Sequence, residues 1–250
     1  MKKIKDPVLF EKIRVFLTEH MPVLRKTSPN TVEAYRYTIN IYLNFLRLVH
    51  AKALCDVTIK DFNQKNILLF RDWLVDARNN KVTTVNLRLT HLKRFCRFLM
   101  AENVIMLSEL SAIQKIAELP NTNAEEVRFL TVQETKLILA QPNTKRDIGL
   151  RDSFFMYLLY DSGCRVQEML DLKLKDFVIS EGKAHLHIVG KGNKFRVTPI
   201  SDELCPMFAD YCSCFHKNGN YHDYLFYIKR KSVTSQLSRG RVPKTCKITG

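Results

Sequence analysis

The chain has 250 residues, of which 46% are hydrophobic and 26% charged, a composition typical of folded globular domains and not of disordered chains. Forty Lys and Arg against 25 Asp and Glu give a formal net charge of +15, which favours DNA, RNA or an acidic membrane surface as the partner. We find no apolar run of about eighteen residues and no signal peptide. The seven irregularly spaced cysteines therefore indicate reduced thiols, and we expect a cytoplasmic protein.

Residues 1–26 are predicted to form an N-terminal helix. Leu9, Ile13, Phe16 and Leu17 recur at helical spacing among charged residues, which is the pattern of an amphipathic helix. A signal peptide would need a continuous apolar stretch at this place.

Residues 27–105 are predicted to form a small helical domain. Ser28 is a favourable N-cap and Pro29 a favourable first helical residue, so a helix is expected to begin here and run to about residue 46. Two more apolar-periodic stretches follow, at 61–74 and 84–99. The last of these helices carries a polar stripe at spacings of four, three and four residues, made of Asn86, Thr90, Lys93 and Arg97.

The net charge is concentrated in this first block. Residues 1–104 contain 19 Lys and Arg and nine Asp and Glu, a surplus of 10 out of the total of +15. For a single run of basic residues a solvated helix face is the simpler interpretation. A surplus of this size in one small helical domain instead indicates binding to a phosphate backbone.

The second block, 127–250, follows an expected interdomain linker over 106–126, which contains Pro120 and Asn121. Helices are predicted at 132–140, 151–160 and 165–170. Alternating strands at 184–189 and 195–200 flank a Gly-Lys-Gly-Asn-Lys turn and so predict a β-hairpin. The fold class expected is mainly α, of the α+β type, with a helical N-terminal domain and a mixed helical second domain that carries a small antiparallel sheet.

Three stretches in order resemble the tyrosine recombinases of the phage integrase family, in particular the Xer-like and mobile-element integrases. The first, 28–35, resembles the opening of the core-binding (SAM-like) domain. The second, from 129–131 through 161–170, resembles the first catalytic box of the family, and the third, 188–200, resembles its lysine hairpin. The resemblance covers residues 28–230, and it implies a core-binding domain over 27–105 and part of a recombinase catalytic domain over 127–250.

The resemblance implies phosphoryl transfer through a tyrosine nucleophile, without a metal or any other cofactor. Arg165 corresponds to the first catalytic arginine, which neutralises phosphate oxygens, and Glu168 would orient it. A structural ion pair between these two residues is the alternative. Lys191 corresponds to the lysine that protonates the leaving oxygen, with Lys194 as a nearby competitor.

Double-stranded DNA is the expected partner, bound by a homo-oligomer, a tetramer in the family pattern; no membrane or small-molecule substrate is expected. The residues expected to contact DNA include the polar stripe and its neighbours on the first domain together with two hairpin residues: Thr31, Arg36, Asn86, Arg88, Thr90, Lys93, Arg94, Arg97, Lys194 and Arg196.

The family pattern continues with a His-x-x-Arg helix and the nucleophilic tyrosine, which we do not find after Phe226. The string His91–Arg94 lies in the first domain and is not assigned to catalysis. Residues 229–250 are expected to form a basic disordered tail. We therefore expect DNA binding without cleavage by these residues alone, from a truncated, frame-shifted or cut recombinase. An active enzyme completed by further sequence or by a partner, and a non-catalytic DNA-binding regulator on a recombinase scaffold, are the alternatives.

Overall fold

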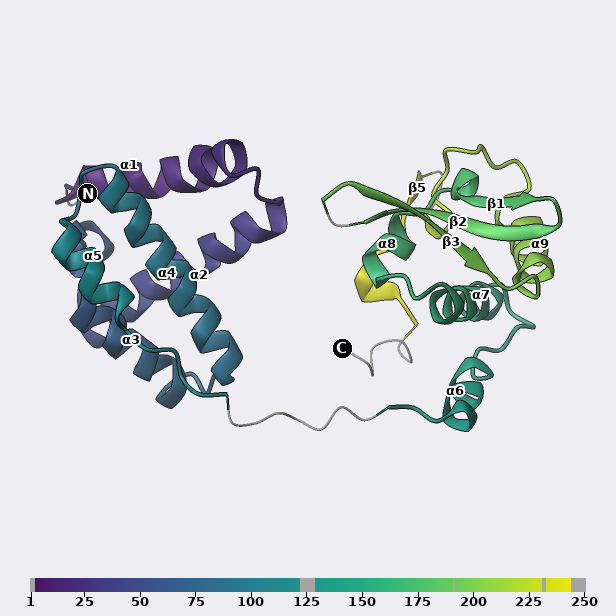
Figure 1. The fold of residues 1–250 in the computed structure, drawn as a ribbon, viewed down its shortest axis with the longest axis horizontal. Coiled ribbons are helices and arrows are strands. Elements are labelled where there is room, and N and C mark those ends of the chain that lie inside the picture. The colour runs from purple at the N-terminus through teal and green to yellow at the C-terminus, as the bar shows by residue number, and fades with distance from the viewer. Residues whose placement is uncertain (1–2, 122–128, 191, 231–232, 244–250) are drawn as a thin grey trace. The chain divides into compact units, whose positions relative to one another are not determined.

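The computed structural model describes residues 3–121, 129–190, 192–230 and 233–243. The chain divides into two compact units, residues 1–126 and 127–250 (Figure 1). The first is helical and the second combines helices with a small antiparallel sheet, so the expected fold class is confirmed. Within the described ranges, none of the helices has both the length and the apolar character needed to cross a bilayer.

The first unit is a bundle of helices in which α4 contacts α2, α3 and α5. The expected N-terminal helix is made of α1 and a π-helical continuation, η1, which contains Pro22. The elements of this unit are α1 (Pro7–Val15), η1 (Phe16–Leu24), α2 (Pro29–Val49), the short 3-10 turns η2 (Leu54–Asp56) and η3 (Ile59–Asp61), α3 (Gln64–Asp76), α4 (Val82–Ala101) and α5 (Leu107–Gln114).

Helix α2 begins where its sequence signals place it. The Ser28 hydroxyl accepts a hydrogen bond from the Thr31 backbone N–H, and Pro29 is the first helical residue. The buried face of α2 contributes Tyr42 and Phe45, which pack against Phe62 and Phe70 in a cluster of aromatic rings. Burial of such rings is the main favourable contribution to the stability of a domain of this size.

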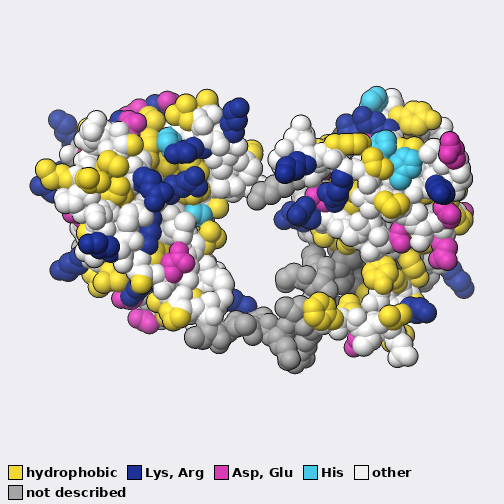
Figure 2. Space-filling view, viewed as in Figure 1, with side chains coloured by type: hydrophobic (Ala, Val, Ile, Leu, Met, Phe, Trp, Pro, Cys, Tyr) yellow, Lys and Arg dark blue, Asp and Glu magenta, His cyan; other side chains and the backbone are white. Residues whose placement is uncertain are grey.

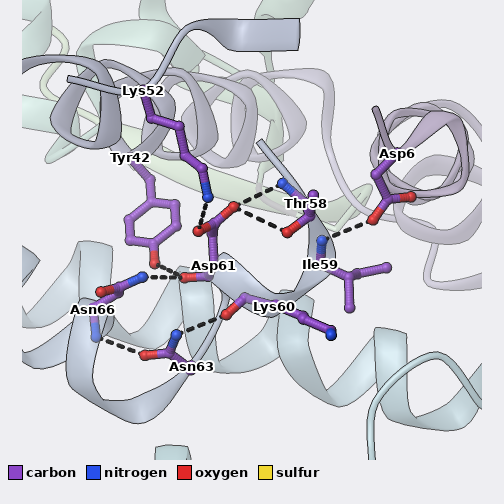
Figure 3. A network of polar contacts seen from close by, with 9 residues as sticks. All are labelled: Asp6, Tyr42, Lys52, Thr58, Ile59, Lys60, Asp61, Asn63 and Asn66. Carbon is purple, nitrogen blue, oxygen red and sulfur yellow. Dashed lines mark hydrogen bonds and ion pairs between the residues drawn. The ribbon is translucent and has the colours of Figure 1, made fainter. Parts of the chain in front are cut away.

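A polar network fixes the segment between α2 and α3 (Figure 3). The Asp61 carboxylate accepts hydrogen bonds from the Lys52 ammonium at 2.5 Å and from the Thr58 backbone N–H at 2.7 Å. The Asp61 carbonyl accepts from the buried Tyr42 hydroxyl at 2.6 Å. Asp6 ties the start of α1 to the same turn, because its carboxylate accepts from the backbone N–H groups of Leu9 and Ile59. The network satisfies polar groups that would be costly to bury without partners.

The segment 106–126, expected to be a linker, is partly helical. Helix α5 lies within it, and Leu110, Ile113 and Ile116 are buried in the core of the first unit. The periodicity of this helix is weak because it spans only eight residues. The first unit therefore extends further along the chain than its expected boundary at residue 105.

The second unit has a three-stranded antiparallel sheet of order β1-β2-β3, with α7 and α9 on its buried side (Figure 1). The expected hairpin is present as β2 and β3. The elements of this unit are α6 (Val132–Leu139), α7 (Asp147–Ser162), α8 (Val166–Asp171), η4 (Leu174–Asp176), β1 (Phe177–Ser180), β2 (Lys183–Gly190), β3 (Lys194–Ile200), α9 (Leu204–Phe215), β4 (Tyr227–Arg230), β5 (Val233–Gln236) and η5 (Arg239–Arg241).

The prediction of a disordered tail from residue 229 onward is wrong for its described part. Strands β4 and β5 pair in antiparallel register, with Tyr227 opposite Gln236. Leu237 and Val242 are buried in the core of the second unit, together with Phe226. The many basic residues of this segment favoured a prediction of disorder, but its few apolar residues are sufficient to pack it against the core.

Candidate functional site

Arg165 occupies the junction between α7 and α8. Helix α7 ends at Gly163, whose φ of 58° lies in the left-handed region that glycine adopts at low cost. Arg165 is the N-cap of α8, with extended φ and ψ. Its side chain is 71% exposed. The junction thus holds the backbone of Arg165 in place and leaves its guanidinium available to a ligand.

Glu168 is the buried centre of the site, with a side-chain exposure of only 7%. Its carboxylate accepts four hydrogen bonds: two from Arg165, through the backbone N–H at 3.0 Å and Nη1 at 2.8 Å, and two from Arg196, through Nη2 at 2.7 Å and Nη1 at 3.3 Å. Four donors match the acceptor capacity of a carboxylate. Arg196 first, and then Arg165, lower the pKa of Glu168 to about 2 against the opposing effect of desolvation.

Both the structural and the functional interpretation of the Arg165–Glu168 pair agree with this geometry. The pair exists, as the three-residue spacing on one helix predicts. The sequence pattern did not reveal that Arg196, on β3, is the second partner of Glu168. Arg196 was expected to contact DNA, and two of its guanidinium nitrogens are instead directed at Glu168.

The hairpin joins this network through Gly190, the last residue of β2. A Cβ at this position would lie 2.9 Å from Glu168 Oε1 and 3.0 Å from Arg196 Nη1, so a larger residue would displace the ends of these two side chains. Lys191 lies outside the described residues. The turn continues with Gly192 and Asn193, both at positive φ, and Lys194 is exposed at the start of β3, opposite Gly190.

The C-terminal segment supports α8 from the other side. The Gln236 side-chain amide donates to the Leu170 carbonyl at 3.0 Å and to the Asp171 carboxylate at 2.6 Å. Arg239 donates to the Gln167 side-chain oxygen at 3.0 Å. The helix that carries Glu168 is therefore held by residues about 65 to 72 positions further along the chain.

In the first unit, the polar stripe of α4 binds the chain that follows α5. Asn86 accepts from the Leu119 backbone N–H and donates to the Leu119 carbonyl, both at 2.9 Å. Lys93 donates to the carbonyls of Gln114, at 3.2 Å, and Ile116, at 2.6 Å, where a cation stabilises the C-terminal end of α5. Thr90 and Arg97 complete the stripe with hydrogen bonds to Glu118 and Gln114.

A second polar face of α4 lies against α2 and contains Arg88, His91 and Arg94. Arg88 lies over the Tyr37 ring at 5.5 Å, and Arg94 donates to the Tyr35 hydroxyl at 3.4 Å. In Figure 2, Lys and Arg side chains gather near the middle of the face of the first unit that is turned to the viewer. The face of α4 that lies against α2 thus brings guanidinium groups and tyrosine rings together.

Positive charges on this face lie close enough to influence one another. Burial is the largest cause that lowers the pKa of His91, of His20 and of Arg88, and nearby arginines add to it: Arg88 and Arg94 at His91, Arg25 and then Arg94 at His20, and Arg78 at Arg88. We refer to the four arginines as the basic ridge: Arg25, Arg78, Arg88 and Arg94. Arg88 and Arg94 were among the DNA contacts expected from the sequence, whereas Arg25 and Arg78, which come from two other segments of the chain, were not.

His91 is a neutral, structural residue in the middle of the basic ridge. Burial, followed by the charges of Arg88 and Arg94, lowers its pKa to about 4. The Thr38 hydroxyl donates to the Ala34 carbonyl at 3.0 Å, so it accepts from the His91 Nδ1–H at 2.8 Å. The segment His91–Arg94 therefore matches the His-x-x-Arg pattern in sequence, but His91 has a structural role.

Thr31 and Arg36, the remaining expected DNA contacts, lie on the exposed first turns of α2. The Thr31 hydroxyl is 2.9 Å from that of Ser28, and Arg36 pairs with Glu33 at 3.2 Å.

His216 of the second unit hydrogen-bonds to the Leu225 carbonyl at 2.9 Å. In the described ranges, no three His, Cys, Asp or Glu side chains are grouped so that they could hold a metal ion.

Comparison with known sequences defines the class of protein. The model of the phage integrase family matches residues 128–250, and the model of the phage integrase N-terminal SAM-like domain matches residues 16–103. The chain is 31% identical over 200 residues to the putative integrase/recombinase y4rC of Sinorhizobium fredii, covering 79% of this chain and 59% of y4rC. It is 26% identical over 230 residues to the tyrosine recombinase XerD of Pasteurella multocida, covering 91% of this chain and 72% of XerD.

Solved structures show the same fold. The XerH site-specific recombinase in a post-cleavage complex with palindromic difH substrate matches with a TM-score of 0.63 at 18% identity, over 99% of this chain and 72% of XerH. A lambda integrase dimer bound to a COC′ core site matches with a TM-score of 0.61 at 17% identity, over 96% of this chain and 62% of the integrase chain. The chain belongs to the phage integrase family of tyrosine recombinases. It spans about three fifths of the length of y4rC.

Proposed function

We propose that these 250 residues bind duplex DNA at a recombination site and present one half of a tyrosine recombinase active site to the scissile phosphate. The observation that carries the proposal is the Arg165 guanidinium, which is 71% exposed while its partner Glu168 is buried. An exposed, oriented guanidinium is suited to the oxygens of a phosphate. XerH and the lambda integrase, which share the fold, are DNA-bound in their structures.

Each residue has a distinct role in the proposed reaction. A tyrosine oxygen attacks phosphorus and the bond from phosphorus to the 5′-oxygen breaks, so that the departing oxygen must gain a proton. Lys191 supplies that proton. Arg165 neutralises the negative charge that builds on the non-bridging oxygens, and Glu168 orients Arg165. The covalent 3′-phosphotyrosyl link conserves the energy of the broken phosphodiester bond, so a 5′-hydroxyl can later reverse the step without any cofactor.

The DNA-contacting surface of the first unit is proposed to be the basic ridge. Arg88 and Arg94 each contact a tyrosine of α2, Tyr37 and Tyr35 respectively. The stripe of Asn86 and Lys93 is directed at backbone groups of residues 114–119 instead. We therefore assign Asn86 and Lys93 to the stability of the unit and not to DNA contact. Thr31 and Arg36, exposed at the start of α2, remain proposed contacts, as does Lys194 on the hairpin.

Charge-removing variants test this surface. The double variant Arg88→Gln/Arg94→Gln is expected to weaken binding to a 30-base-pair duplex about tenfold or more in fluorescence anisotropy and to reduce the salt slope by about two. The matched control is Arg14→Gln, because Arg14 also carries one positive charge of the first unit but is paired with Glu11 and Glu19. If the loss of duplex affinity per removed charge were the same for the ridge variant and for Arg14→Gln, DNA binding would not be localised to the basic ridge.

The second part of the proposal is that residues 1–250 bind without cutting when they act alone. The printed sequence after Phe226 contains neither a His-x-x-Arg segment nor a tyrosine in the family's order. The remaining groups of the site would come from further sequence of a longer protein or from a partner. A DNA-binding regulator on the same scaffold would share this behaviour, but the arrangement of Arg165 around Glu168 favours a recombinase site.

A denaturing gel distinguishes binding from cutting. Duplexes selected by the protein from a random library would be incubated with it, and protein-linked DNA would be sought after boiling in detergent. We expect a retarded complex under native conditions and no covalent adduct. An adduct that survives detergent would show that these residues contain a working nucleophile and would refute this part of the proposal.

A further inference from the structure

We propose that Arg196 is a positioning residue, which offsets the charge of Glu168 so that Glu168 can orient Arg165 without cancelling the charge that Arg165 offers to a phosphate. This inference rests on the proposed role of Arg165 as a phosphate ligand. It gives Arg196 a role through Glu168, in place of the direct DNA contact expected from the sequence.

The geometry divides the Glu168 carboxylate equally between the two arginines. Arg196 approaches it with both terminal nitrogens, Nη2 at 2.7 Å and Nη1 at 3.3 Å. Arg165 uses one terminal nitrogen and its backbone N–H. The other two guanidinium nitrogens of Arg165, Nε and Nη2, make no hydrogen bond to Glu168 and can face a ligand. Because all the acceptor positions are taken, the carboxylate has no free oxygen with which to draw Arg165 into a tighter pair.

The charges of the three groups explain why a second arginine is needed. Arg165 and Glu168 alone sum to zero, and a neutral pair attracts a phosphate only through its dipole. With Arg196 the cluster carries one net positive charge, and the more exposed of the two guanidinium groups, at 71% against 39%, is that of Arg165. The free charge is therefore presented at Arg165, where it stabilises an anion most directly.

The backbone of the hairpin is adapted to the same network. Gly190 leaves the space that Glu168 Oε1 and Arg196 Nη1 occupy, since a Cβ would lie within 3.0 Å of each. Gly190 is not at positive φ, so what glycine offers here is space for these two side-chain ends and not an unusual backbone conformation. The residue that follows is Lys191. The network thus joins the first catalytic box to the strand that leads into the lysine turn.

The experiment follows Arg165 by NMR in the full chain while inorganic phosphate is added. The side-chain Nε–Hε signal of Arg165, assigned through Arg165→Lys, reports phosphate binding, and the carboxyl carbon of Glu168 reports its titration. The variant is Arg196→Gln. The matched control is Lys183→Gln, which removes one positive charge at an exposed position of the same sheet, at the start of β2.

In the Arg196→Gln variant we expect the phosphate affinity at Arg165 to fall about fivefold and the pKa of Glu168 to rise toward its ordinary value. The Lys183→Gln control should change the affinity less than twofold. The phosphate affinity of Arg196→Lys, which keeps the charge but not the bidentate hydrogen bonding to Glu168, is expected to lie between those of the wild type and Arg196→Gln. An Arg196→Lys affinity as low as that of Arg196→Gln would overturn the charge argument.

The outcomes separate the two proposals. If phosphate does not perturb Arg165 even in the wild-type chain, the proposed role of Arg165 fails, and the role of Arg196 fails with it. If phosphate binds at Arg165 in the wild type and equally well in folded Arg196→Gln, only the role of Arg196 fails. Circular dichroism of each variant establishes that it is folded before the titration.

Discussion

Replacing Asn86 by alanine tests whether the polar stripe of α4 serves the fold or the DNA. Asn86 makes two hydrogen bonds to the backbone of Leu119, each at 2.9 Å. Each such bond contributes about 1 kcal/mol net, and a half-buried partner left unsatisfied adds to the cost, so Asn86→Ala should destabilise the first unit by about 2–3 kcal/mol. For a unit of this size that corresponds to a fall in melting temperature of roughly 8–12 °C.

The assay uses the single tryptophan of the chain. Trp73 lies on α3 and packs against Phe45 and Phe70, so its fluorescence during urea unfolding follows the first unit. The control is Thr83→Ala, at an exposed position of the same helix, which should change the stability by less than about 0.5 kcal/mol. The reasoning would be refuted if Asn86→Ala unfolded like the wild type and bound DNA about tenfold more weakly.

Three further predictions concern the second unit. Glu168→Gln should lower the free energy of unfolding by about 1–2 kcal/mol above pH 5, after allowing for the solvent exposure of both arginines. The pKa of Glu168 in the folded protein, about 2, lies below its ordinary value of 4.5. The difference in unfolding free energy between Glu168→Gln and the wild type, measured by calorimetry, should therefore shrink as the pH falls from 5 toward 2. A difference that stays constant would show that it does not come from the ionised carboxylate. Gly163→Ala should lower the stability by about 1 kcal/mol through backbone strain alone, since a Cβ there meets nothing within 4 Å. Gly149→Ala should prevent normal folding of the unit, because its Cβ would lie 2.0 Å from the Asn143 carbonyl oxygen. Equal melting temperatures of the two variants would contradict this. Arg165→Ala should leave duplex affinity within about threefold of the wild type, because most phosphate contacts lie elsewhere; a loss as large as that of the ridge double variant in fluorescence anisotropy would show otherwise.

Local sequence signals predicted the elements that carry Arg165 and the hairpin. Gly163 ends α7 and the turn glycines join β2 to β3, and each signal acts over a few residues. The spacing between Arg165 and Glu168 is likewise local and predicted their ion pair.

Contacts between distant parts of the chain could not be predicted in this way. Arg196 reaches Glu168 across 28 positions and Asn86 reaches Leu119 across 33, so each contact depends on tertiary packing. The contacts of the polar stripe with residues 114–119 were not predictable either, because a regular row of polar side chains has the same pattern whether it faces DNA or the backbone of another segment. The tail was misjudged because charge dominated its composition, although Leu237 and Val242 are buried.

The salt dependence of duplex binding tests the central claim most directly. The affinity of the chain for a 30-base-pair duplex would be measured by fluorescence anisotropy between about 50 and 200 mM salt, for the wild type and the ridge double variant side by side. With roughly five to seven phosphate contacts, the logarithm of the wild-type affinity should fall linearly with the logarithm of salt concentration, with a slope of about −5 to −6, and the variant should have a slope smaller in magnitude by about two. A flat response, or identical slopes for the two proteins, would contradict a DNA-binding recombinase surface on the basic ridge.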